Sequence, residues 1–443
     1  MDEGQGLHVV IIGAGIGGLA SALALAKHGI HRIDVYEVAS NLGFVGAGIQ
    51  LAPNMVRILQ RLGCWEPIAR EATELKIASI RQSSDDKELS RVDFAHIEER
   101  YGTPHMVGHR ASLVGELYNA SKEEKAISFH FNSSCTIKSW EPRPVYTVTP
   151  LDGAPYDGHA DVVLAADGIK SSVRSRILKE LDVDAEITDS GQSAYRIMLT
   201  RAQMANDPEM LGLLESDQVT RWIGEQRHVI AYPISNKTIY NISTAHPDIH
   251  FAAAPSATYT TRGSKEDMLD SFKDFCPVVQ RMLNLVPDGE VCEWKLRVHS
   301  PLPTWVRGCV ALVGDACHPT LPHLAQGAAQ AIEDGGVLAV VLSMLPNQSP
   351  SSINKALKIY EFLRKERAET LVDLAAASGR ALHLGEGAER EQRDKQFAAL
   401  VRLKKGPNPD KYLDAEVQEM IMGTDVMKIA QDEMRRALEV GID

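Results

Sequence analysis

The chain lacks the features by which membrane, secreted and disulfide-bonded proteins are usually identified. It has no run of roughly eighteen or more apolar residues, the length that a membrane-spanning helix requires. Its first residues, MDEGQG, have neither the basic region nor the cleavage pattern of a signal peptide. The six cysteines are scattered and include no CxxC pair, so a disulfide framework is not expected. We therefore predict a cytoplasmic protein with reduced thiols and no membrane partner.

Basic residues are also fewer than acidic residues. The chain has 47 Lys and Arg against 59 Asp and Glu, a net charge of −12, whereas nucleic-acid binding needs a basic face. Nucleic acid is therefore not an expected partner, although a small anionic substrate is compatible because local fields can oppose the net charge. With 443 residues and no internal repeat, the chain is too long for one simple core, and two or three structural units are expected.

The beginning of the chain has the pattern of a nucleotide-binding β-α-β unit. A short apolar run, residues 7–12, precedes GAGIGG and an Ala- and Leu-rich segment, and a second apolar run ends at Glu37. The glycines of this GxGxxG motif are Gly13, Gly15 and Gly18. They permit a tight turn and close approach of a pyrophosphate to a helix N-terminus, and a carboxylate about twenty residues later binds ribose. A cluster of turn glycines before an ordinary strand is the alternative. The carboxylate favours FAD or NAD over NADP.

Two more buried strands, each ending at an aspartate, occur far along the chain. They are ADVVLAADG, residues 160–168, and CVALVGD, residues 309–315. A strand-rich segment lies between them, and the chain after about residue 351 has a helical pattern. The predicted fold is α/β, with a Rossmann-like domain built from separated segments, an inserted β-sheet substrate domain and C-terminal helices. The expected boundaries are 1–77, 104–182 and 285–360 for the nucleotide-binding domain, 78–103 and 183–284 for the substrate domain, and 361–443 for the helical region.

The segment GDACHPTLPHLAQGAAQAIED, residues 314–334, places Cys317, His318 and His323 close together, as a metal site would. Zinc needs three or four ligands in a suitable geometry, but two prolines interrupt this group and the sequence offers no second cluster. We therefore predict no metal site. The small residues that follow predict a helix beginning near Gln326, whose N-terminus would stabilise negative charge on a bound group.

Two further motifs are weak when each is taken alone. DGIKSSVR, which begins at Asp167, is compatible with an ordinary turn, and GHRASL places Arg110 just before a predicted helix. In combination and in this order, the motifs resemble the flavin-dependent aromatic hydroxylases, the single-component group A monooxygenases, over roughly residues 7–384. Within that family, VGAGIQLAPN and the segment 314–334 are most similar to salicylate hydroxylase, 6-hydroxynicotinate 3-monooxygenase and the fungal 4-hydroxybenzoate 1-hydroxylases. The resemblance implies a Rossmann-like FAD-binding domain of the aromatic-hydroxylase type.

The resemblance also implies the cofactors. FAD would be bound, NADH or NADPH would be a transient co-substrate because there is no second GxGxxG, and O2 would react with reduced flavin to give a C4a-hydroperoxide that donates oxygen. The residues that the resemblance assigns to FAD are Gly13, Gly15 and Gly18 at the pyrophosphate, Glu37 at the ribose, Asp315 at the ribityl chain, Gly327 and Ala328 at the isoalloxazine, and also Gly48, Arg110 and Asp167.

The candidate residues for activating and binding the substrate rest on a shorter motif. RHVIAYPI places His228 and Tyr232 four residues apart in a predicted strand, hence on one face. A phenol reacts faster as a phenolate, and the resemblance implies that His228 is the base and Tyr232 its partner; a polar pair on a half-buried sheet is the alternative. Arg196 is a candidate anchor for a carboxylate, or else a flavin contact or surface cation. Further pocket candidates are Gln50, Pro322 and His323.

The predicted function is hydroxylation of a small phenolic acid, at the carbon that bears the carboxylate and with loss of CO2. Pro322 replaces a polar side chain that some members of the family carry, so the ring position stays open. The first alternative is hydroxylation of a ring C–H of another electron-rich aromatic without decarboxylation. A non-catalytic protein of the same fold, and an oxidoreductase such as an amine oxidase or a urate-type hydroxylase, are the others. A monomer or homodimer is expected.

Overall fold

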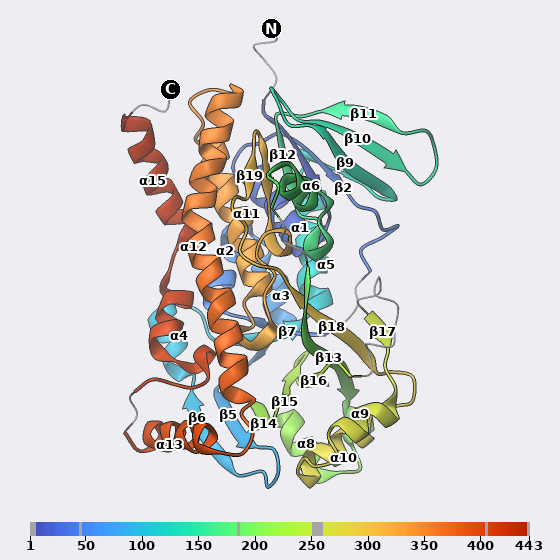
Figure 1. Ribbon diagram of the computed structural model, residues 1–443, viewed down its shortest axis with the longest axis vertical. Coiled ribbons are helices and arrows are strands. Elements are labelled where there is room, and N and C mark those ends of the chain that lie inside the picture. The colour runs from blue at the N-terminus through green and yellow to red at the C-terminus, as the bar shows by residue number, and fades with distance from the viewer. Residues whose placement is uncertain (1–5, 44–46, 184–186, 250–259, 404–405, 441–443) are drawn as a thin grey trace.

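Two large β-sheets connected by helices organise the molecule (Figure 1). The computed structural model describes residues 6–43, 47–183, 187–249, 260–403 and 406–440. The first sheet has the order β19-β20-β12-β1-β2-β8, and its neighbouring strands run parallel except for β19 and β20. Its strands are β1 (His8–Ile12), β2 (Arg32–Tyr36), β8 (Ile127–His130), β12 (Val162–Ala165), β19 (Val306–Arg307) and β20 (Val310–Leu312).

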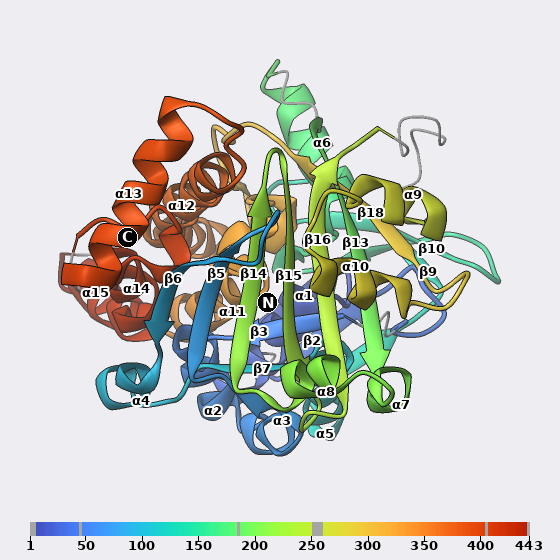
Figure 2. The same cartoon turned by 90° about the horizontal axis from the view of Figure 1, so that it is seen from below.

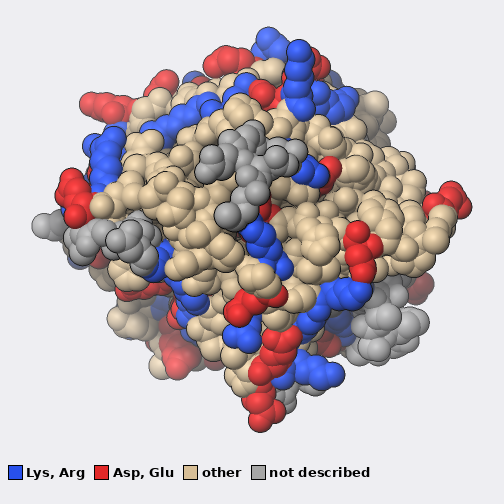
Figure 3. Space-filling model, turned by 90° about the horizontal axis from the view of Figure 1, so that it is seen from above, with Lys and Arg blue, Asp and Glu red and all other residues tan. Residues whose placement is uncertain are grey.

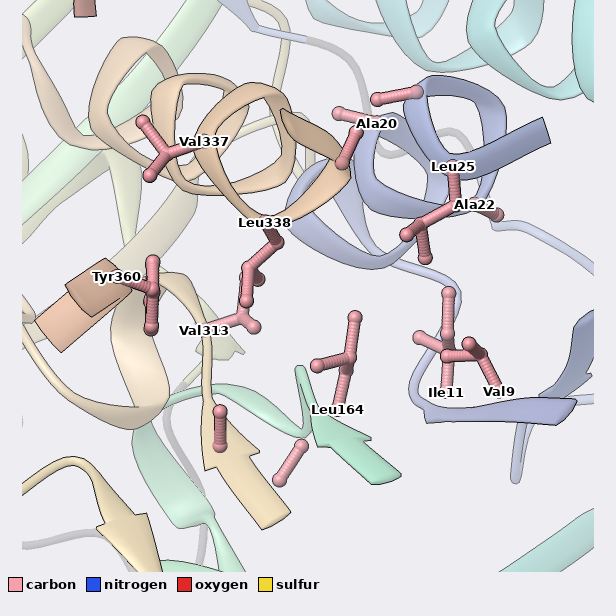
Figure 4. Packing of buried hydrophobic residues seen from close by; sticks show 14 of the residues in the cluster. Val9, Ile11, Ala20, Ala22, Leu25, Leu164, Val313, Val337, Leu338 and Tyr360 are labelled. Carbon is pink, nitrogen blue, oxygen red and sulfur yellow. The ribbon is translucent and has the colours of Figure 1, made fainter. Parts of the chain in front are cut away.

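Helices rich in small residues pack against this sheet. β1 is buried along its whole length, as its run of branched apolar residues predicts for a central parallel strand. Two helices, α1 (Ile16–Lys27) and α11 (Gly327–Ser343), approach so closely that a Cβ on Gly335 would lie 2.8 Å from the backbone nitrogen of Ser21. Figure 4 shows the apolar side chains, Leu164 among them, that fill the space between these helices and the strands.

The second sheet has eight strands in the order β17-β18-β13-β16-β15-β14-β5-β6 (Figure 2). Its strands are β5 (Ile77–Gln82), β6 (Glu88–Asp93), β13 (Thr188–Thr200), β14 (Gln218–Gly224), β15 (Arg227–Ile234), β16 (Ile239–Pro247), β17 (Thr260–Arg262) and β18 (Cys292–Val298). One face of this sheet, with Tyr195 and Trp222, forms a core with three helices, α8 (Pro208–Glu215), α9 (Lys265–Ser271) and α10 (Pro277–Asn284). That core is separate from the core of the first sheet.

The opposite face, which we call the pocket face, follows from the strand register. Arg196 of β13 lies opposite a serine of β16, that serine lies opposite Ile230 of β15, and Ile230 lies opposite Arg221 of β14. The side chains of these register partners therefore point to the same side of the sheet. His228 and Tyr232 lie two residues before and two residues after Ile230 in β15, so they point to the same side. The pocket face therefore carries two arginines, a histidine and a tyrosine.

Smaller elements complete the two parts. A three-stranded sheet contains β3 (Gly48–Leu51), β7 (Met106–His109) and β4 (Thr73–Glu74), and another contains β9 (Ser133–Ser139), β10 (Val145–Pro150) and β11 (Tyr156–His159). The accompanying helices are α2 (Pro53–Leu62), α3 (Trp65–Glu71), α4 (Ala95–Tyr101), α5 (Arg110–Glu123), α6 (Ser172–Glu180) and α7 (Arg201–Met204).

The longest helix, α12 (Pro350–Leu382), runs alongside both parts (Figure 1). Its first half contributes Leu357 to the core of the six-stranded sheet, and its second half contributes Leu371 to the core beneath the pocket face. The chain then continues through α13 (Ala388–Leu403), the short turn η5 (Lys411–Leu413), α14 (Ala415–Gln418) and α15 (Val426–Val440).

The predicted fold class is confirmed, but the expected limits at 285 and at 361 do not match the elements of the structure. β18 lies within 285–360, which was expected to belong to the nucleotide-binding domain, yet it pairs with β13 of the eight-stranded sheet. Residue 361, where the helical region was expected to begin, lies inside α12. A continuous helix carries no turn signal, so periodicity alone cannot place a boundary there. The division into domains stays a prediction, with these two limits to be moved.

Candidate cofactor and substrate site

Three loops with predicted site residues meet at one edge of the six-stranded sheet. Ala165 of β12 lies opposite Ile12 of β1 on one side and Leu312 of β20 on the other. Because the carboxyl ends of parallel strands in register lie together, the loops after them form one edge. The predicted residues in these loops are Gly13, Asp167 and Asp315. The register thus brings together three motifs that are far apart in the sequence.

Glycine occupies each of the three motif positions of the first loop for a different physical reason. Gly13 has a φ of 100°, and a Cβ there would collide with the carbonyl oxygen of Ala166. A Cβ on Gly18 would collide with the carbonyl oxygen of Gly13. Gly15 is exposed, and a Cβ on it would meet nothing within 4 Å. Packing therefore requires the first and third glycines, whereas Gly15 leaves open space at the N-terminus of α1, where a phosphate can approach.

A pocket beside this loop is lined by Glu37, Gly15 and Arg110, the first residue of α5. The carboxylate of Glu37 accepts hydrogen bonds from the backbone nitrogens of Ala14, at 2.8 Å, and Ala39, at 2.9 Å. These bonds hold the carboxylate against the glycine loop. A carboxylate and a guanidinium that line one open pocket suit the ribose and pyrophosphate of a dinucleotide.

The two aspartates at this edge have hydrogen-bonding capacity to spare. Asp167 accepts from the backbone nitrogen of Ser172 at 2.8 Å through one oxygen, while its other oxygen is buried with no partner. The side chain of Asp315 is partly accessible to solvent, although protein atoms surround it closely. The resulting desolvation raises the pKa of this carboxyl, and the charges of His318 and Arg110 offset only part of that rise. Carboxylate oxygens of this kind fit the hydroxyl groups of a bound nucleotide, which donate hydrogen bonds.

Buried ion pairs hold the loop after β20 in place. Asp334 of α11 accepts from the backbone nitrogen of Gly314 at 2.9 Å, and its carboxylate lies 2.6 Å from Nε2 of His318. Arg364 of α12 contacts both Asp334, at 2.9 Å, and Glu333, at 2.6 Å, and all three charged side chains are inaccessible to solvent. Burial alone would raise the pKa of both carboxyls, but the neighbouring cations outweigh it and lower both values. The network fixes α11 relative to the loop.

In the described part of the chain, two groups have possible ligand atoms within 4.8 Å of one another: Cys317, His318 and Asp334, and His228, His323 and His383. In the first group, His318 and Arg364 already occupy both oxygens of Asp334. The absence of a metal from that loop stays a prediction. The histidines of the second group come from β15, the short turn η4 (Pro322–Leu324) and the end of α12, so no local spacing indicated them.

The predicted pair on β15 is arranged differently from the expectation. His228 and Tyr232 are both buried and share the pocket face, but Nδ1 of His228 hydrogen-bonds Nε2 of His383 at 2.7 Å. Four residues of a strand span about 13 Å, which is too far for Tyr232 to be the direct partner of His228. Tyr232 instead packs under Gly48, where a Cβ would lie 2.8 Å from its ring. The backbone nitrogen of Gly48 also donates to Asn241 at 2.6 Å, which joins β3 to the second sheet.

The two arginines of the pocket face differ in how their charge is compensated. Arg196 is half-buried with its guanidinium 4.4 Å from the ring centre of Trp294, and burial, followed by the charge of Arg110, lowers its pKa to about 10. Arg221 forms a buried ion pair with Asp410 at 2.8 Å. At neutral pH Arg196 therefore still carries its charge towards the cofactor edge, whereas that of Arg221 is neutralised.

A second pocket opens on this face, between the sheet and the C-terminal segment. Gln50 of β3, Arg221 and Tyr412 of η5 are among its lining residues. The side-chain oxygen of Gln50 and Nε of Arg221 are buried without a partner, so the pocket offers one free acceptor and one free donor. Pro322 is exposed, and His323 is buried with both ring nitrogens unpartnered.

Sequence reasoning missed four residues of this region: Arg221, Asp410, Tyr412 and His383. A strand period extended through β14 could have indicated Arg221. The other three come from the C-terminal segment, and Asp410 is 189 residues from its partner. No local signal connects positions so far apart.

A parallel sheet whose glycine loop meets two aspartate loops, beside a second sheet with its own pocket, has the arrangement of a dinucleotide-dependent oxidoreductase with adjacent cofactor and substrate sites. The comparisons with known proteins agree with this class. The family described as "FAD binding domain" matches residues 6–375, and the chain belongs to that family. It is a FAD-dependent monooxygenase of the aromatic-hydroxylase type.

Individual relatives resemble the chain over most of its length. It is 31% identical to the FAD-dependent monooxygenase atnJ of Arthrinium sp. over 89% of each chain. It is 30% identical to 3-hydroxybenzoate 6-hydroxylase of Polaromonas naphthalenivorans (strain CJ2), over 94% of this chain and 96% of the relative. Among solved structures, a salicylate hydroxylase substrate complex superimposes with a TM-score of 0.77 and 25% identity, covering 96% of this chain and 98% of the other.

The surface and the helices give two further observations. On the face shown in Figure 3, basic and acidic side chains are interspersed. None of the helices within the described ranges combines the length and apolarity needed to cross a membrane.

Proposed function

We propose that the protein hydroxylates a small phenolic acid with O2 and NADH or NADPH, at the carboxylate-bearing carbon and with release of CO2. One observation carries the proposal: a neutral buried histidine, His228, and a charged arginine, Arg196, share the pocket face. Burial holds the pKa of His228 well below its ordinary value, so its imidazole is neutral, the form that can accept a proton. Arg196 interacts electrostatically with Asp315, which connects this face to the cofactor edge.

The residues at the sheet edge would hold FAD, which when bound supplies electron transfer from the nicotinamide and activation of O2. Gly15 and the N-terminus of α1 would face the pyrophosphate, and Glu37 the ribose. Asp167 and Asp315 would accept hydrogen bonds from cofactor hydroxyls. Gly327 and Ala328 would allow close approach to the start of α11, and the ion pairs behind it keep that helix rigid.

The substrate would lie between this edge and the pocket face. Arg196 would bind the carboxylate, and His228 would take the phenol proton, which makes the ring more electron-rich where oxygen is transferred. Two relatives support this substrate class, since 3-hydroxybenzoate and salicylate in their names are both phenolic acids.

A second candidate is ring C–H hydroxylation of a neutral aromatic, without decarboxylation. The ion pair between Arg221 and Asp410 favours it, because this arginine is not free to bind a carboxylate. The unpartnered oxygen of Gln50 and Nε of Arg221 would then recognise a hydroxyl and a carbonyl group. The cytoplasmic location and the monomeric or homodimeric state stay predictions.

The test is oxidation of NADH and NADPH by the purified yellow protein with a panel of hydroxybenzoates and their neutral amide or methyl analogues. CO2 and hydrogen peroxide are measured together. Fast oxidation with CO2 and little peroxide for one acid is the expected result. Hydroxylated product without CO2, strongest for a neutral analogue, would favour the second candidate. Peroxide alone across the panel would contradict both.

A further inference from the structure

The short strand β3 reaches both pockets of the molecule. Gln50, its third residue, lines the pocket on the second sheet. Just before the strand, the carbonyl oxygen of Ala47 accepts a hydrogen bond from the backbone nitrogen of Arg110 at 2.8 Å, and Arg110 lines the cofactor pocket. Gly48, the first residue of β3, pairs with His109, which directly precedes Arg110. The position of β3 therefore affects the geometry of both pockets at once.

The beginning of β3 is hydrogen-bonded to a buried amide on the pocket face. Asn241 of β16 is 2% exposed and lies opposite Tyr232 of β15 in the strand register, so both side chains point to that face. The side-chain oxygen of Asn241 accepts from the backbone nitrogen of Gly48 at 2.6 Å. This bond joins the second sheet directly to the strand that reaches both pockets.

The contact between β3 and the pocket face is close as well as hydrogen-bonded. A Cβ on Gly48 would lie 2.5 Å from Cγ of Asn241 and 2.8 Å from the ring of Tyr232. Both distances are far shorter than the roughly 3.5–4.0 Å at which carbon atoms normally meet. The α-carbon of Gly48 thus lies directly against both side chains, and the hydrogen bond to Asn241 fixes how near β3 comes to the pocket face.

We propose that Asn241 is a positioning residue that aligns the cofactor pocket with the substrate pocket. Its oxygen holds Gly48, and β3 carries that position to Arg110 on one side and to Gln50 on the other. Asn241 acts through the strand and needs no contact with cofactor or substrate. Its role concerns the flavin-dependent reaction as a class, so it is the same for a phenolic acid and for a neutral aromatic.

Replacement of Asn241 by an apolar side chain of similar shape separates this role from packing. In Asn241→Leu the N–H of Gly48 loses its acceptor, and β3 can then move off the pocket face to find another partner. FAD should bind roughly tenfold more weakly, a change of the size expected for one lost hydrogen bond. A displacement of about 1 Å is enough to slow a positioned reaction greatly, so more of the nicotinamide oxidised should yield hydrogen peroxide in place of product.

Two measurements test the two pockets separately. Titration of the cofactor-free proteins with FAD, followed by flavin fluorescence, gives the Kd. Product and peroxide per nicotinamide oxidised, with the substrate that the panel identifies, report the alignment and do not depend on the fraction of folded enzyme. Asn241→Leu should raise the Kd for FAD roughly tenfold and lower the product yield below about half of the wild-type value. Asn241→Asp keeps an accepting oxygen in the same place, so its Kd should stay within about threefold of the wild type, with most of the product yield retained.

Asn236→Gly is the matched control. The side chain of Asn236 also joins the second sheet to the other part of the molecule, through the carbonyl oxygen of Arg70 at 2.9 Å. Neither residue is among those that line the two described pockets. Glycine suits the φ of 51° at Asn236, so this variant removes the bond without strain and should leave both values unchanged.

Gly48→Ala approaches the same contact from the other side. It keeps the hydrogen-bonding atoms but places a Cβ against Asn241, so it should reproduce both losses. The inference is overturned if Asn241→Leu changes neither value or only one of them, or if Asn241→Asp shares its defects in full. Failure of the proposed function is distinguishable: if no acid or neutral analogue of the panel is hydroxylated, the FAD titration still stands, and an unchanged Kd in Asn241→Leu then overturns the inference by itself.

Discussion

The edge of the six-stranded sheet and the pocket face of the eight-stranded sheet are built in opposite ways. At the edge, short motifs carry the site: Gly13, Asp167 and Asp315 each lie in a loop after a strand, and parallel register brings the loops together. On the pocket face, side chains from β13, β14, β15, η4, η5 and the end of α12 meet. The difference shows that a cofactor site can be recognised from short motifs, each local in the sequence, while the neighbouring substrate site depends on single residues that only tertiary packing brings together.

The largest effect is expected at the glycine loop. Gly18→Ala should abolish FAD retention and destabilise the fold, because its Cβ would collide with the carbonyl oxygen of Gly13. Gly15→Val should also lose FAD but keep the stability of the cofactor-free protein, because it projects into open space. Flavin absorbance after gel filtration and thermal unfolding of the cofactor-free proteins are the measurements. Gly17→Ala is the matched control, since its Cβ would lie at an ordinary 3.4 Å from its neighbours, and it should keep FAD.

The next effect concerns the buried ion pairs behind the cofactor edge. Arg364→Met removes the cation that pairs with both buried carboxylates, Glu333 and Asp334, and should lower the free energy of unfolding by about 3–5 kcal/mol. The control is Lys358→Met, which breaks an exposed pair with Glu361 and should cost about 0–1 kcal/mol. Denaturant unfolding measures both. Equal losses would mean that burial of the network does not matter.

These two predictions concern the part of the molecule that the sequence describes well. The strand after which Gly13 lies, the helix beginning near Gln326 and the common face of His228 and Tyr232 follow from apolar runs, glycines and strand period. The partner of His228 could not be predicted, because His383 is 155 residues away and only tertiary packing brings it there. For the same reason the ion pair of Arg221 with Asp410 has no signature in the sequence.

A smaller effect is expected on substrate choice. Asp410→Asn uncovers the charge of Arg221 in the pocket and should raise the ratio of kcat/KM for a phenolic acid over its neutral amide by roughly tenfold, since tenfold corresponds to about 1.4 kcal/mol. Steady-state kinetics with the two substrates measure the ratio, which is independent of the fraction of folded enzyme. An unchanged ratio would mean that Arg221 does not face the substrate.

The smallest effect is expected at Tyr412. Its hydroxyl lies 3.2 Å from Nδ1 of His105, and Tyr412→Phe removes that hydrogen bond while keeping the ring in the pocket wall. The free energy of unfolding should fall by about 0.5–1.5 kcal/mol, with KM changed less than about threefold. Thermal unfolding and steady-state kinetics check this. A large rise in KM would show that the hydroxyl contacts the substrate directly.

The most direct test of the account is a single-turnover experiment. Wild-type and His228→Gln enzymes, each reduced and loaded with the phenolic acid found by the panel, are mixed with O2, and hydroxylated product and hydrogen peroxide are quantified. The wild type should give nearly one product per flavin. His228→Gln should give mostly peroxide, with substrate affinity changed less than about threefold, because only the proton acceptor is lost. Equal product from both enzymes would contradict the assignment of substrate activation to the pocket face.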